Sequence, residues 1–568
     1  MVLLGLAGSA GAATLTVTVT ADTYDGVCDA NCSLKDAIDV AVGSGGPDTV
    51  VLSAATYTAL TPFIFTDAYR QITDDVTILG NGAVIERDPS ASAFRLFEVK
   101  AGGTLALQNL TLRNGSDSDG GAVKNSYGVL SITDCVLENN LATQTGGAVY
   151  HAGVGPLSIT RSSVRYNSAQ SGGGLLAINY TFPAQVSIVD SAFIGNAATD
   201  AGNGVGGAIN FSADVDASIT SCTFSGNSSA TLAGAIGFNS VPIGRVITLL
   251  NTTIVQNAAF VGGGLAEAAC SQNCPNVTKP VLTNTILANN TATIGLTANC
   301  DSTYDSGGHN ILGPPVVSNV NCTILNQSNE ILLTGTLANI AALSSTGTAG
   351  GEHHDLLAGS VAINTANPSL CPATDQLGFT RVVTCERGAI EFRMPMPTIN
   401  PCQAGKKKCV RTKMLGLLAC HFKAEKFGVP VNPVCLQSRY DAFTKCCTKL
   451  EATGTFCPTS GDCNLLETKV DSFVFDVVQA LDPAYPTPVQ NLCSAKKKRC
   501  VAKKAAALLR CHVKAEKTGV LNPTCLDNAH DAFDGGGNPA QSCFAPLEAA
   551  GNCLTVGDTA ALEATVDA

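Results

Sequence analysis

Cysteine offers the most obvious chemistry in this chain, which contains 24 of them in 568 residues. Such a number favours an oxidising compartment, where thiols form disulfide bonds. Three cysteines within residues 402–420 are spaced 7 and 11 residues apart, and three within residues 435–457 are spaced 11 and 11. Each spacing returns to one face of an α-helix, which predicts two antiparallel helices with facing cysteines. The predicted nested bridges are Cys402–Cys457, Cys409–Cys446 and Cys420–Cys435.

A second copy of this pattern begins at Cys493 and also carries a Cys-His dipeptide and a basic cluster. The same reasoning predicts bridges Cys493–Cys553, Cys500–Cys543 and Cys511–Cys525. Cys447 and Cys463 have no counterparts in this copy, so we expect them to pair with each other. Pairs of cysteines close in sequence predict four local bridges: Cys28–Cys32, Cys270–Cys274, Cys300–Cys322 and Cys371–Cys385. Small helical hairpins bury little surface, so each bridge contributes substantially to their stability.

The Cys-His dipeptides at residues 420–421 and 511–512 raise the question of a cofactor. Attachment of a c-type haem requires another cysteine three residues before the first one, and Leu417 and Leu508 occupy those positions. Zinc is a weaker interpretation than disulfide bonding in an oxidising compartment. We therefore expect no cofactor and no metal.

Two basic clusters, Lys406–Lys408 and Lys496–Arg499, lie at equivalent places in the two copies. They are candidates for binding an anionic glycan, a lipid headgroup or nucleic acid. A solvated helix face explains them equally well, and the sequence leaves both interpretations open.

Acidic, basic and histidine side chains in residues 1–392 form no arrangement that predicts catalysis. Asp134, Arg161 and Asp190 share one position in successive repeats, which predicts a surface ladder of charges. His353-His354-Asp355 could hold a metal, but neighbours on a strand point to opposite faces, so we expect a solvated loop. We predict no catalytic residue.

The structural element that positions the charged residues of this part of the chain is a repeat between Leu130 and Ala292. Six asparagines mark it: Asn140, Asn167, Asn196, Asn227, Asn257 and Asn290. A large apolar residue stands three positions before each asparagine, a small one five before and an aliphatic one eight before. Glycine pairs or near-matches, such as Gly146-Gly147, separate the units. Self-similarity at roughly 26 to 34 residues is typical of a solenoid.

Alternating apolar residues inside each unit predict short strands rather than helices. Stacked about 4.8 Å apart, such strands pair in parallel and bury one common core. The predicted fold is therefore mainly β, a right-handed parallel β-helix solenoid, followed by two small disulfide-stapled α-helical hairpin repeats. We expect asparagine to suit the turns by bonding neighbouring backbone and tolerating left-handed dihedrals. Cys135 and Cys222 would lie three coils apart, roughly 14 Å, and stay as buried free thiols.

Composition and local signals complete the division of the chain. The net charge of −11 is uneven: residues 1–401 carry 14 basic and 29 acidic side chains, and residues 402–568 carry 20 and 16. Ser33 with Asp36 predicts the capped start of a short helix covering the open end of the core. No run reaches the roughly 18 apolar residues of a membrane span. The predicted parts are a signal peptide (1–13), N-terminal cap and first coils (14–100), β-helix with closing coils (101–393), linker (394–401), helical repeat (402–481), linker (482–492) and second helical repeat (493–568).

Several segments resemble bacterial extracellular β-helix proteins. Cys32-Ser33-Leu34-Lys35-Asp36-Ala37 is similar to the Cys-Ser-Leu-Arg-Glu-Ala segment at the start of many of them. Gly-Gly-Ala-(Ile/Leu/Val) and Phe-x-x-Asn tetrapeptides, the latter at Phe193 and Phe224, resemble the repeats of polymorphic outer-membrane proteins. Residues 283–392 resemble a C-terminal module of such solenoids, which implies last coils that close the core.

The resemblance implies a secreted or cell-surface protein with a non-catalytic role in adhesion or envelope structure. Its implied partners are extracellular glycans or envelope components, with no specific nucleic acid. The alternative is a polysaccharide lyase or hydrolase, similar to pectate lyase, acting on acidic glycans. The tryptophan-containing signature of pectate lyases is missing because the chain has no tryptophan. We therefore expect binding rather than catalysis.

Overall fold

The computed structural model describes residues 11–64, 66–267, 278–293, 298–313, 323–325, 329–333, 339–357, 359–381, 384–392, 401–452, 461–518, 522–535, 538, 540 and 542–567. The chain divides into two units, Met1–Phe392 and Arg393–Ala568. Most of the predicted signal peptide and linker lie outside the described residues. So do four cysteines with predicted partners: Cys270, Cys274, Cys322 and Cys457.

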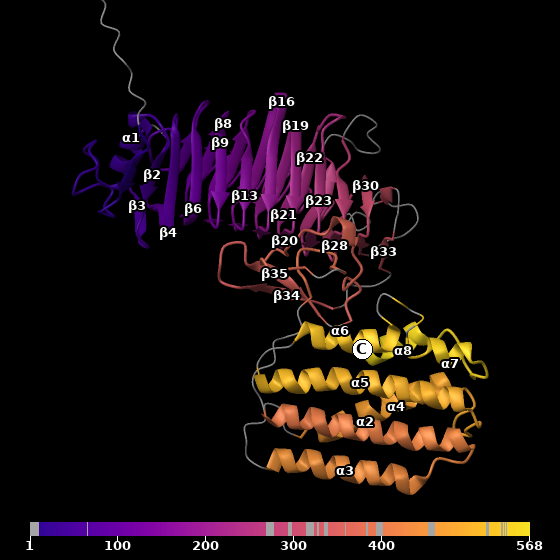
Figure 1. Cartoon of the computed structure of the whole chain (residues 1–568). Coiled ribbons are helices and arrows are strands. Elements are labelled where there is room, and N and C mark those ends of the chain that lie inside the picture. Colours follow the sequence, from indigo (N-terminus) through magenta and orange to yellow (C-terminus); the bar gives the residue numbers. More distant parts are fainter. Residues whose placement is uncertain are drawn as a thin grey trace, which may run out of the picture. The chain divides into compact units, whose positions relative to one another are not determined.

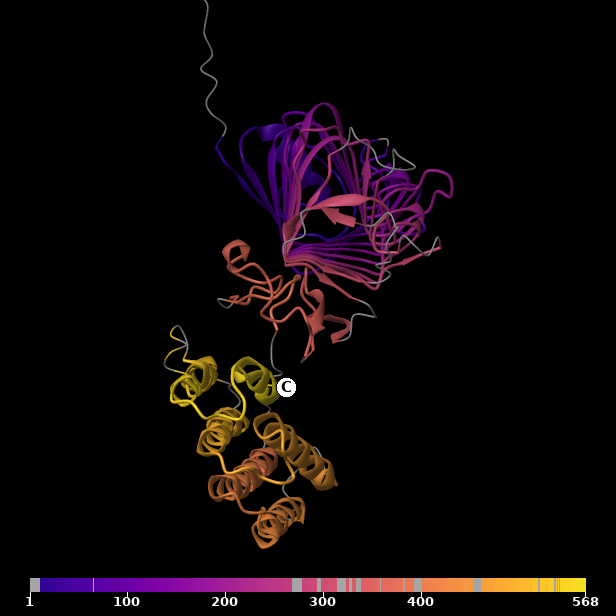
Figure 2. The same ribbon diagram turned by 90° about the vertical axis from the view of Figure 1, so that its right-hand side faces the viewer.

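The first unit is a parallel β-helix, as predicted, and it has about nine turns (Figures 1 and 2). Its principal row of paired strands comprises β1 (Thr14–Thr16), β2 (Asp48–Val51), β4 (Asp75–Arg87), β6 (Thr104–Arg113), β9 (Val129–Thr133), β13 (Leu157–Thr160), β16 (Leu175–Val189), β19 (Ile209–Thr220), β23 (Ile247–Leu250), β27 (Val281–Thr283), β30 (Thr303–Gly308) and β32 (Thr323–Leu325). Each strand pairs in parallel with the next in this row, so sequence repeats become spatial neighbours.

Further rows complete each coil. One contains β10 (Val136–Glu138), β14 (Ser163–Arg165), β17 (Ala192–Ile194), β20 (Thr223–Ser225), β24 (Thr253–Val255), β28 (Ile286–Ala288), β31 (Ile311–Leu312) and β33 (Ile331–Leu332). Another contains β5 (Phe97–Val99), β8 (Val123–Ser126), β12 (Val149–Ala152), β22 (Ile236–Asn239) and β26 (Leu265–Glu267), and β3 (Thr56–Ala59) pairs with β4. A separate seven-stranded sheet contains β7 (Ser116–Asp119), β11 (Leu141–Thr145), β15 (Ser168–Ala169), β18 (Ala197–Ala198), β21 (Ser228–Leu232), β25 (Ala258–Val261) and β29 (Thr291–Ala292).

Equivalent side chains lie over one another, as the repeat predicts. Ile132 pairs with Ile159, which pairs with Ile188, and the row continues through Ile219 to Leu249. In the second row Phe193 lies beside Phe224, and their rings stack with centroids 5.0 Å apart. These side chains are fully buried, and the core is continuous along the described coils.

The six asparagines form a buried ladder. Asn196 shows the pattern: its side-chain amide donates to the Oδ1 of Asn227 at 2.9 Å and to the carbonyl of Val164 at 2.8 Å. Its Oδ1 accepts the backbone N–H of Asn167 at 3.1 Å and the amide of that side chain at 3.0 Å. Each amide thereby joins neighbouring coils and satisfies polar groups that water does not reach.

The expected left-handed dihedrals belong to other residues than the ladder asparagines. In every unit the residue just before the asparagine has a positive φ, for example Asn139 at 55° and Tyr166 at 55°. The position six before the asparagine does the same, as at Asp134 and Arg161. The asparagine side chain must point into the core, so the chain reverses one residue earlier. Our placement of the turn conformation on the asparagine was wrong.

The glycine pairs mark a third corner. At Gly147 an added Cβ would lie 2.1 Å from the carbonyl oxygen of Gly173 in the next coil, so no larger residue fits. The first residue of each pair has a positive φ, including Ala233, which replaces glycine at 58°. Cys135 and Cys222 are buried free thiols, as predicted.

The N-terminal end begins as expected. Helix α1 (Leu34–Ser44) starts at Ser33, which forms the predicted capping box with Asp36. Its apolar face, including Leu34 and Ile38, is buried in the solenoid core. A disulfide joins Cys28 to Cys32, as predicted, and holds the loop before the helix.

The C-terminal part of this unit differs from our expectation that residues 283–392 are last coils closing the core. β30 to β33 do extend the coils, but residues 339–392 do not. They form the antiparallel hairpin β34 (Ile340–Ser345) and β35 (Glu352–Leu356), the short helix η2 (Pro368–Leu370) and extended segments. This segment, which we name the flank segment, runs back along the outside of the β14–β31 row.

Polar and apolar contacts attach the flank segment to the solenoid. Arg165 on β14 pairs with Glu352 at 2.6 Å, and Thr223 on β20 hydrogen-bonds Gln376 at 2.6 Å. A second core forms between them from residues of both parts: Val255, Ile286, Ala288, Ile311, Leu356 and Ala362. The outward residues of β17, β20, β24 and β28 are uncharged and buried, and this was the sequence signal of a covered face.

The second unit is helical and disulfide-bonded (Figure 1). Its helices are α2 (Pro401–Phe427), α3 (Pro433–Ala452), α4 (Cys463–Leu481), α5 (Leu492–Thr518), α6 (Pro523–Asp534), α7 (Ala545–Ala549) and α8 (Thr559–Asp567). Its disulfides are Cys409–Cys446, Cys420–Cys435, Cys447–Cys463, Cys493–Cys553, Cys500–Cys543 and Cys511–Cys525. Cys371–Cys385 lies in the first unit. Cys300 and Cys402 are also disulfide-bonded, and their predicted partners lie outside the described residues.

The second copy departs from a simple hairpin. Helix α6 ends at Asp534, and the next residue, Gly535, forms a left-handed C-cap with a φ of 89°. Cys543 and Cys553 therefore lie beyond the helix, before and after α7. Each copy also adds a further helix, α4 in the first and α8 in the second. The cysteine spacing predicted the bridges but not these helices.

Candidate functional site

An exposed group of tyrosines lies on the solenoid. Tyr127 lies between β8 and β9, Tyr150 on β12, and Tyr180 at the bend of β16. Tyr127 is 55% exposed and Tyr180 is 77% exposed, although large side chains elsewhere in the solenoid are mostly buried. Together with Lys124 on β8 they make up what we name the tyrosine patch.

Contacts within the tyrosine patch hold Tyr150 in place. The ammonium group of Lys124 lies 5.5 Å from the centre of the Tyr150 ring, in a cation–π arrangement. Burial, the carboxylate of Asp119 and the hydroxyl groups of Tyr180 and Tyr127 all raise the pKa of Tyr150. Adjacent coils therefore present several ring faces and hydroxyl groups on one surface. The tyrosine patch was not predicted from the sequence, because its members follow no fixed interval before the ladder asparagines.

The predicted ladder of charges exists in part. Arg161 binds Asp134 through two hydrogen bonds of 2.7 and 2.8 Å, and both side chains are about half exposed. Asp190 continues the same corner, but the flank segment passes beside it: a Cβ on Gly350 would lie 2.8 Å from the Asp190 carbonyl. Burial and the charge of Asp375 raise the pKa of Asp190 to about 6. An exposed ion pair of this kind stabilises the fold only slightly.

A cluster of buried acidic side chains lies within the flank segment. Asp375, Glu386 and Glu391 are buried around Arg381, whose guanidinium donates to Glu391 at 3.2 Å. Burial and a hydrogen bond with Glu391 raise the pKa of Glu386 to about 9. Perturbed carboxyl groups often mark active sites, but a glycan chain needs an open groove to reach them. This cluster fastens the flank segment instead.

Neither histidine of the pair at residues 353–354 lies in a solvated loop, and that prediction was wrong. Both are on β35 and are buried. His354 shares hydrogen bonds with Ser225 on β20 at 2.9 Å and with the carbonyl of Ala341. His353 contacts Ser344 and the carbonyl of Gly351 instead. The two rings use separate partners because adjacent residues on a strand point in opposite directions.

Most of the two basic clusters is neither a ligand patch nor a solvated face. Lys406 binds Glu451 and Asp462, and the equivalent Lys497 binds Glu548 and Asp558. Lys413 and Lys504 repeat this arrangement further along α2 and α5. Lys413 binds Glu467 and Asp471, and Lys504 binds Glu563 and Asp567. All four ammonium groups are buried, so each connects helices within one copy.

The neighbouring lysines join the two copies. Lys407 on α2 pairs with Glu516 on α5, and Lys498 on α5 pairs with Glu425 on α2 at 2.6 Å. Equivalent residues thus exchange equivalent contacts across the antiparallel helices, as in a two-fold symmetric interface. Lys498 and Glu425 are each 1% exposed, and burial lowers the pKa of the lysine and raises that of the glutamate to about 7.

Two groups in the helical unit have side chains close enough for a metal. Cys447 and Cys463 belong to the first, but their thiols are joined in a disulfide. His530, Glu563 and Asp567 form the second, where the ammonium of Lys504 already contacts both carboxylates. A lysine charge at that position replaces the cation, so we assign no metal to the described side chains.

No protein-family model matches this chain, and no curated protein matches it significantly. No described helix is both long enough and apolar enough to cross a membrane. The parallel β-helix and the disulfide bonds fit a secreted protein.

Proposed function

We propose that this protein is a secreted or cell-surface β-helix protein that binds extracellular glycans through the tyrosine patch, without transforming them. Tyrosine combines an apolar ring face with a polar hydroxyl group. A sugar ring has the matching character, with apolar C–H faces edged by hydroxyl groups. The neighbouring rings of Tyr127 and Tyr180, which are exposed, and of Tyr150, which is half-buried, are the observation that carries this proposal.

The stiffness of the surface supports binding. Successive coils are held by parallel strand pairing and by the asparagine ladder, so side chains on adjacent coils keep a fixed spacing. A preorganised surface loses less conformational entropy when a ligand binds. Lys124 and Asp119 lie beside the rings and supply a donor and an acceptor for sugar hydroxyls.

The burial of the acidic cluster around Arg381 supports a non-catalytic role. A lyase or hydrolase acting on acidic glycans needs its acid and base groups within reach of the scissile bond. The exposed pair Asp134 and Arg161 neutralise each other, and the perturbed carboxyl group of Glu386 is 3% exposed.

The wider biological setting is also a proposal. The Phe-x-x-Asn and Gly-Gly-Ala repeats resemble those of polymorphic outer-membrane proteins, which supports a bacterial origin and an adhesin-like role. We propose that the solenoid displays the binding surface and that two helical repeats, 402–481 and 493–568, form a separate disulfide-bonded unit.

Glycan-array binding with the full chain tests the proposal. We expect wild-type protein to bind a subset of glycans and the double variant Tyr150→Ala/Tyr180→Ala to lose at least tenfold in affinity for them. Tyr166→Ala is the matched control, since Tyr166 is also exposed, at 56%, but lies at a corner and outside the patch. Loss of binding in the control alone would contradict the assignment of the patch.

A parallel screen for turnover separates binding from catalysis. Uronate polymers are incubated with the protein, with and without calcium. We expect neither unsaturated nor new reducing-end products. Products that depend on the protein would replace this proposal with the lyase or hydrolase alternative.

A further inference from the structure

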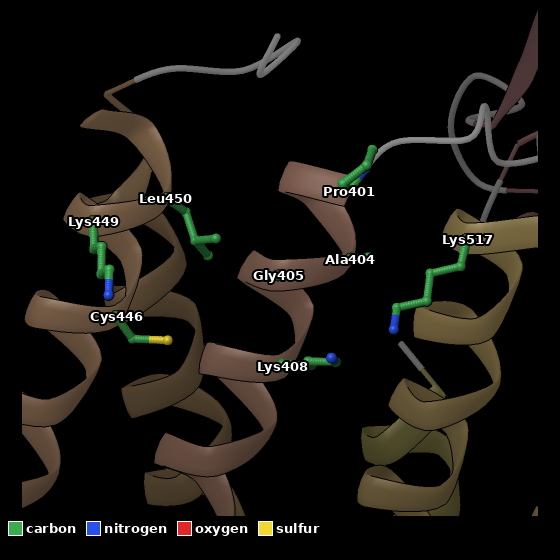
Figure 3. Close-up of a pocket in the computed structure, with 8 residues that line it drawn as sticks. All are labelled: Pro401, Ala404, Gly405, Lys408, Cys446, Lys449, Leu450 and Lys517. Carbon is green, nitrogen blue, oxygen red and sulfur yellow. The ribbon is translucent and has the colours of Figure 1, made fainter. Parts of the chain in front are cut away.

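Two lysines of the helical unit lie beside each other instead of beside a carboxylate. Six lysines there, Lys406, Lys407, Lys413, Lys497, Lys498 and Lys504, each contact a carboxylate. Lys408 on α2 and Lys517 on α5 contact none within the described part of the unit; instead they face each other (Figure 3). The charge of Lys517 and a direct side-chain contact with it lower the pKa of Lys408. Two adjacent ammonium groups without an acid make a site for an anion.

The two lysines lie at one end of a groove of about 640 Å³, within the range of small-molecule sites. We name it the lysine groove. It is lined by Pro401, Ala404, Gly405 and Lys408 of α2, Cys446, Lys449 and Leu450 of α3, and Lys517 of α5. Figure 3 shows Lys408 and Lys517 on one side of α2, and Leu450 with Cys446 on the other. The groove therefore passes over the first turns of α2, from the pair Lys408 and Lys517 to a part of α3 where Leu450 lies beside a third lysine, Lys449.

Gly405 lets Leu450 of α3 pack closely against α2 at the edge of the groove. A Cβ at this position would lie 2.7 Å from the Leu450 side chain, so a larger residue would displace Leu450 from the lining. The equivalent residue in the second copy is Lys496. There the equivalent of Lys408 is Arg499, which lies 3.7 Å from the centre of the Phe422 ring and is thereby occupied. The two copies differ at positions that line the groove in the first.

The lining also restricts the ligand. None of the lining residues is aromatic, and opposite Lys408 and Lys517 the surface is formed by Leu450, the Cys409–Cys446 disulfide and the side chain of Lys449. A sugar body would leave most of its hydroxyl groups without partners there, whereas an alkyl chain is favoured by burial of apolar surface. A carboxylate at the lysine end would accept charge-assisted hydrogen bonds.

We propose that the lysine groove binds a single-chain aliphatic carboxylate, with its carboxylate between Lys408 and Lys517 and its alkyl chain across Gly405 toward Leu450. This site is independent of the glycan surface proposed above, because it involves only residues of the helical unit.

Calorimetric titration of the full, oxidised chain tests the site with three probes below any micelle concentration. Dodecanoate carries both features, dodecyltrimethylammonium carries the chain with the opposite charge, and glucuronate carries a carboxylate on a sugar. We expect saturable binding of dodecanoate and none of the other two at the same concentrations. Equal binding of dodecyltrimethylammonium, or binding of glucuronate without dodecanoate, would overturn the proposal.

Variants locate the site. Lys408→Gln/Lys517→Gln should weaken dodecanoate binding at least tenfold, because both charge-assisted hydrogen bonds are lost. Lys496→Gln/Lys503→Gln makes the same change of charge at exposed residues of α5, roughly 20 to 30 Å from Lys517 along the helix, and should change affinity less than twofold. Gly405→Leu should also weaken binding, because the new side chain would displace Leu450 from the lining, while circular dichroism shows unchanged helicity. Wild-type affinity in the Lys408/Lys517 double variant would refute the site.

Discussion

Replacing Asn227 by alanine tests the asparagine ladder, because this side chain lies in its middle and is fully buried. Its amide donates to the carbonyl of Phe193 at 2.8 Å and to the Oδ1 of Asn257 at 2.9 Å. Its own Oδ1 accepts the backbone N–H and the side-chain amide of Asn196, both at 2.9 Å. Alanine keeps the backbone pairing of the coils and removes all these bonds together.

The expected cost follows from the number of bonds. A typical intramolecular hydrogen bond contributes about 1 kcal/mol net, and a buried group left unpaired costs about 1–3 kcal/mol. Losing the side-chain bonds of Asn227 should therefore cost about 4 kcal/mol, since the groups left behind on Phe193, Asn196 and Asn257 have no water to replace them. Such a value is large for one substitution.

Hydrogen–deuterium exchange of peptides across β17, β20 and β24 measures the opening free energy of these coils separately from the helical unit. Asn203→Ala is the matched control, because Asn203 is exposed in the loop between β18 and β19 and should change stability by no more than about 0.5 kcal/mol. A loss below about 1 kcal/mol in Asn227→Ala, or an equal loss in the control, would refute the ladder as a main source of stability.

Two further predictions concern titration and thiol access. The raised pKa of Glu386, about 9 against an ordinary 4.5, means that its contribution to stability is complete below pH 4.5 and is lost as the pH rises through 9. The melting temperature of wild-type protein should therefore fall between pH 5 and 9, and that of Glu386→Gln should fall less; parallel slopes would contradict this. Burial raises the pKa of the Cys135 thiol to about 12, and Cys222 is buried as well. An alkylating reagent should modify neither thiol in the native protein and both in denaturant without reductant, as mass spectrometry would show; modification of native protein would contradict their burial.

Most of the solenoid could be predicted from the sequence, because its coils repeat the same pattern of residues. The interval from Ile132 to Ile159 and onward predicts the strand register, because a stacked coil places equivalent residues over one another. Ser33 and Asp36 predict the first helix, since a capping box is a local interaction. In each case the residues that determine the structure lie close in sequence or recur at a fixed interval.

The flank segment was not predicted, because each of its contacts occurs only once and joins residues that are far apart in the sequence. Glu352 contacts Arg165, which lies 187 residues away in the sequence, and Gln376 contacts Thr223, which lies 153 residues away. No repeat marks such pairs, and the uncharged outer residues of β17 to β28 show only that something covers them. The buried histidines of β35 were misplaced for the same reason.

The coils, the asparagine register and the cysteine pairs that face each other on α2 and α3 followed from the order of the residues, because short-range geometry and regular spacing suffice for these. Which charges are paired internally depends instead on how distant segments pack together. Lys406, Lys407 and Lys408 are consecutive and chemically identical, yet the first two bind carboxylates brought by distant segments and the third faces Lys517. The direction of each side chain around α2 and the helix that packs against that face set this difference, and neither can be read from a run of three lysines.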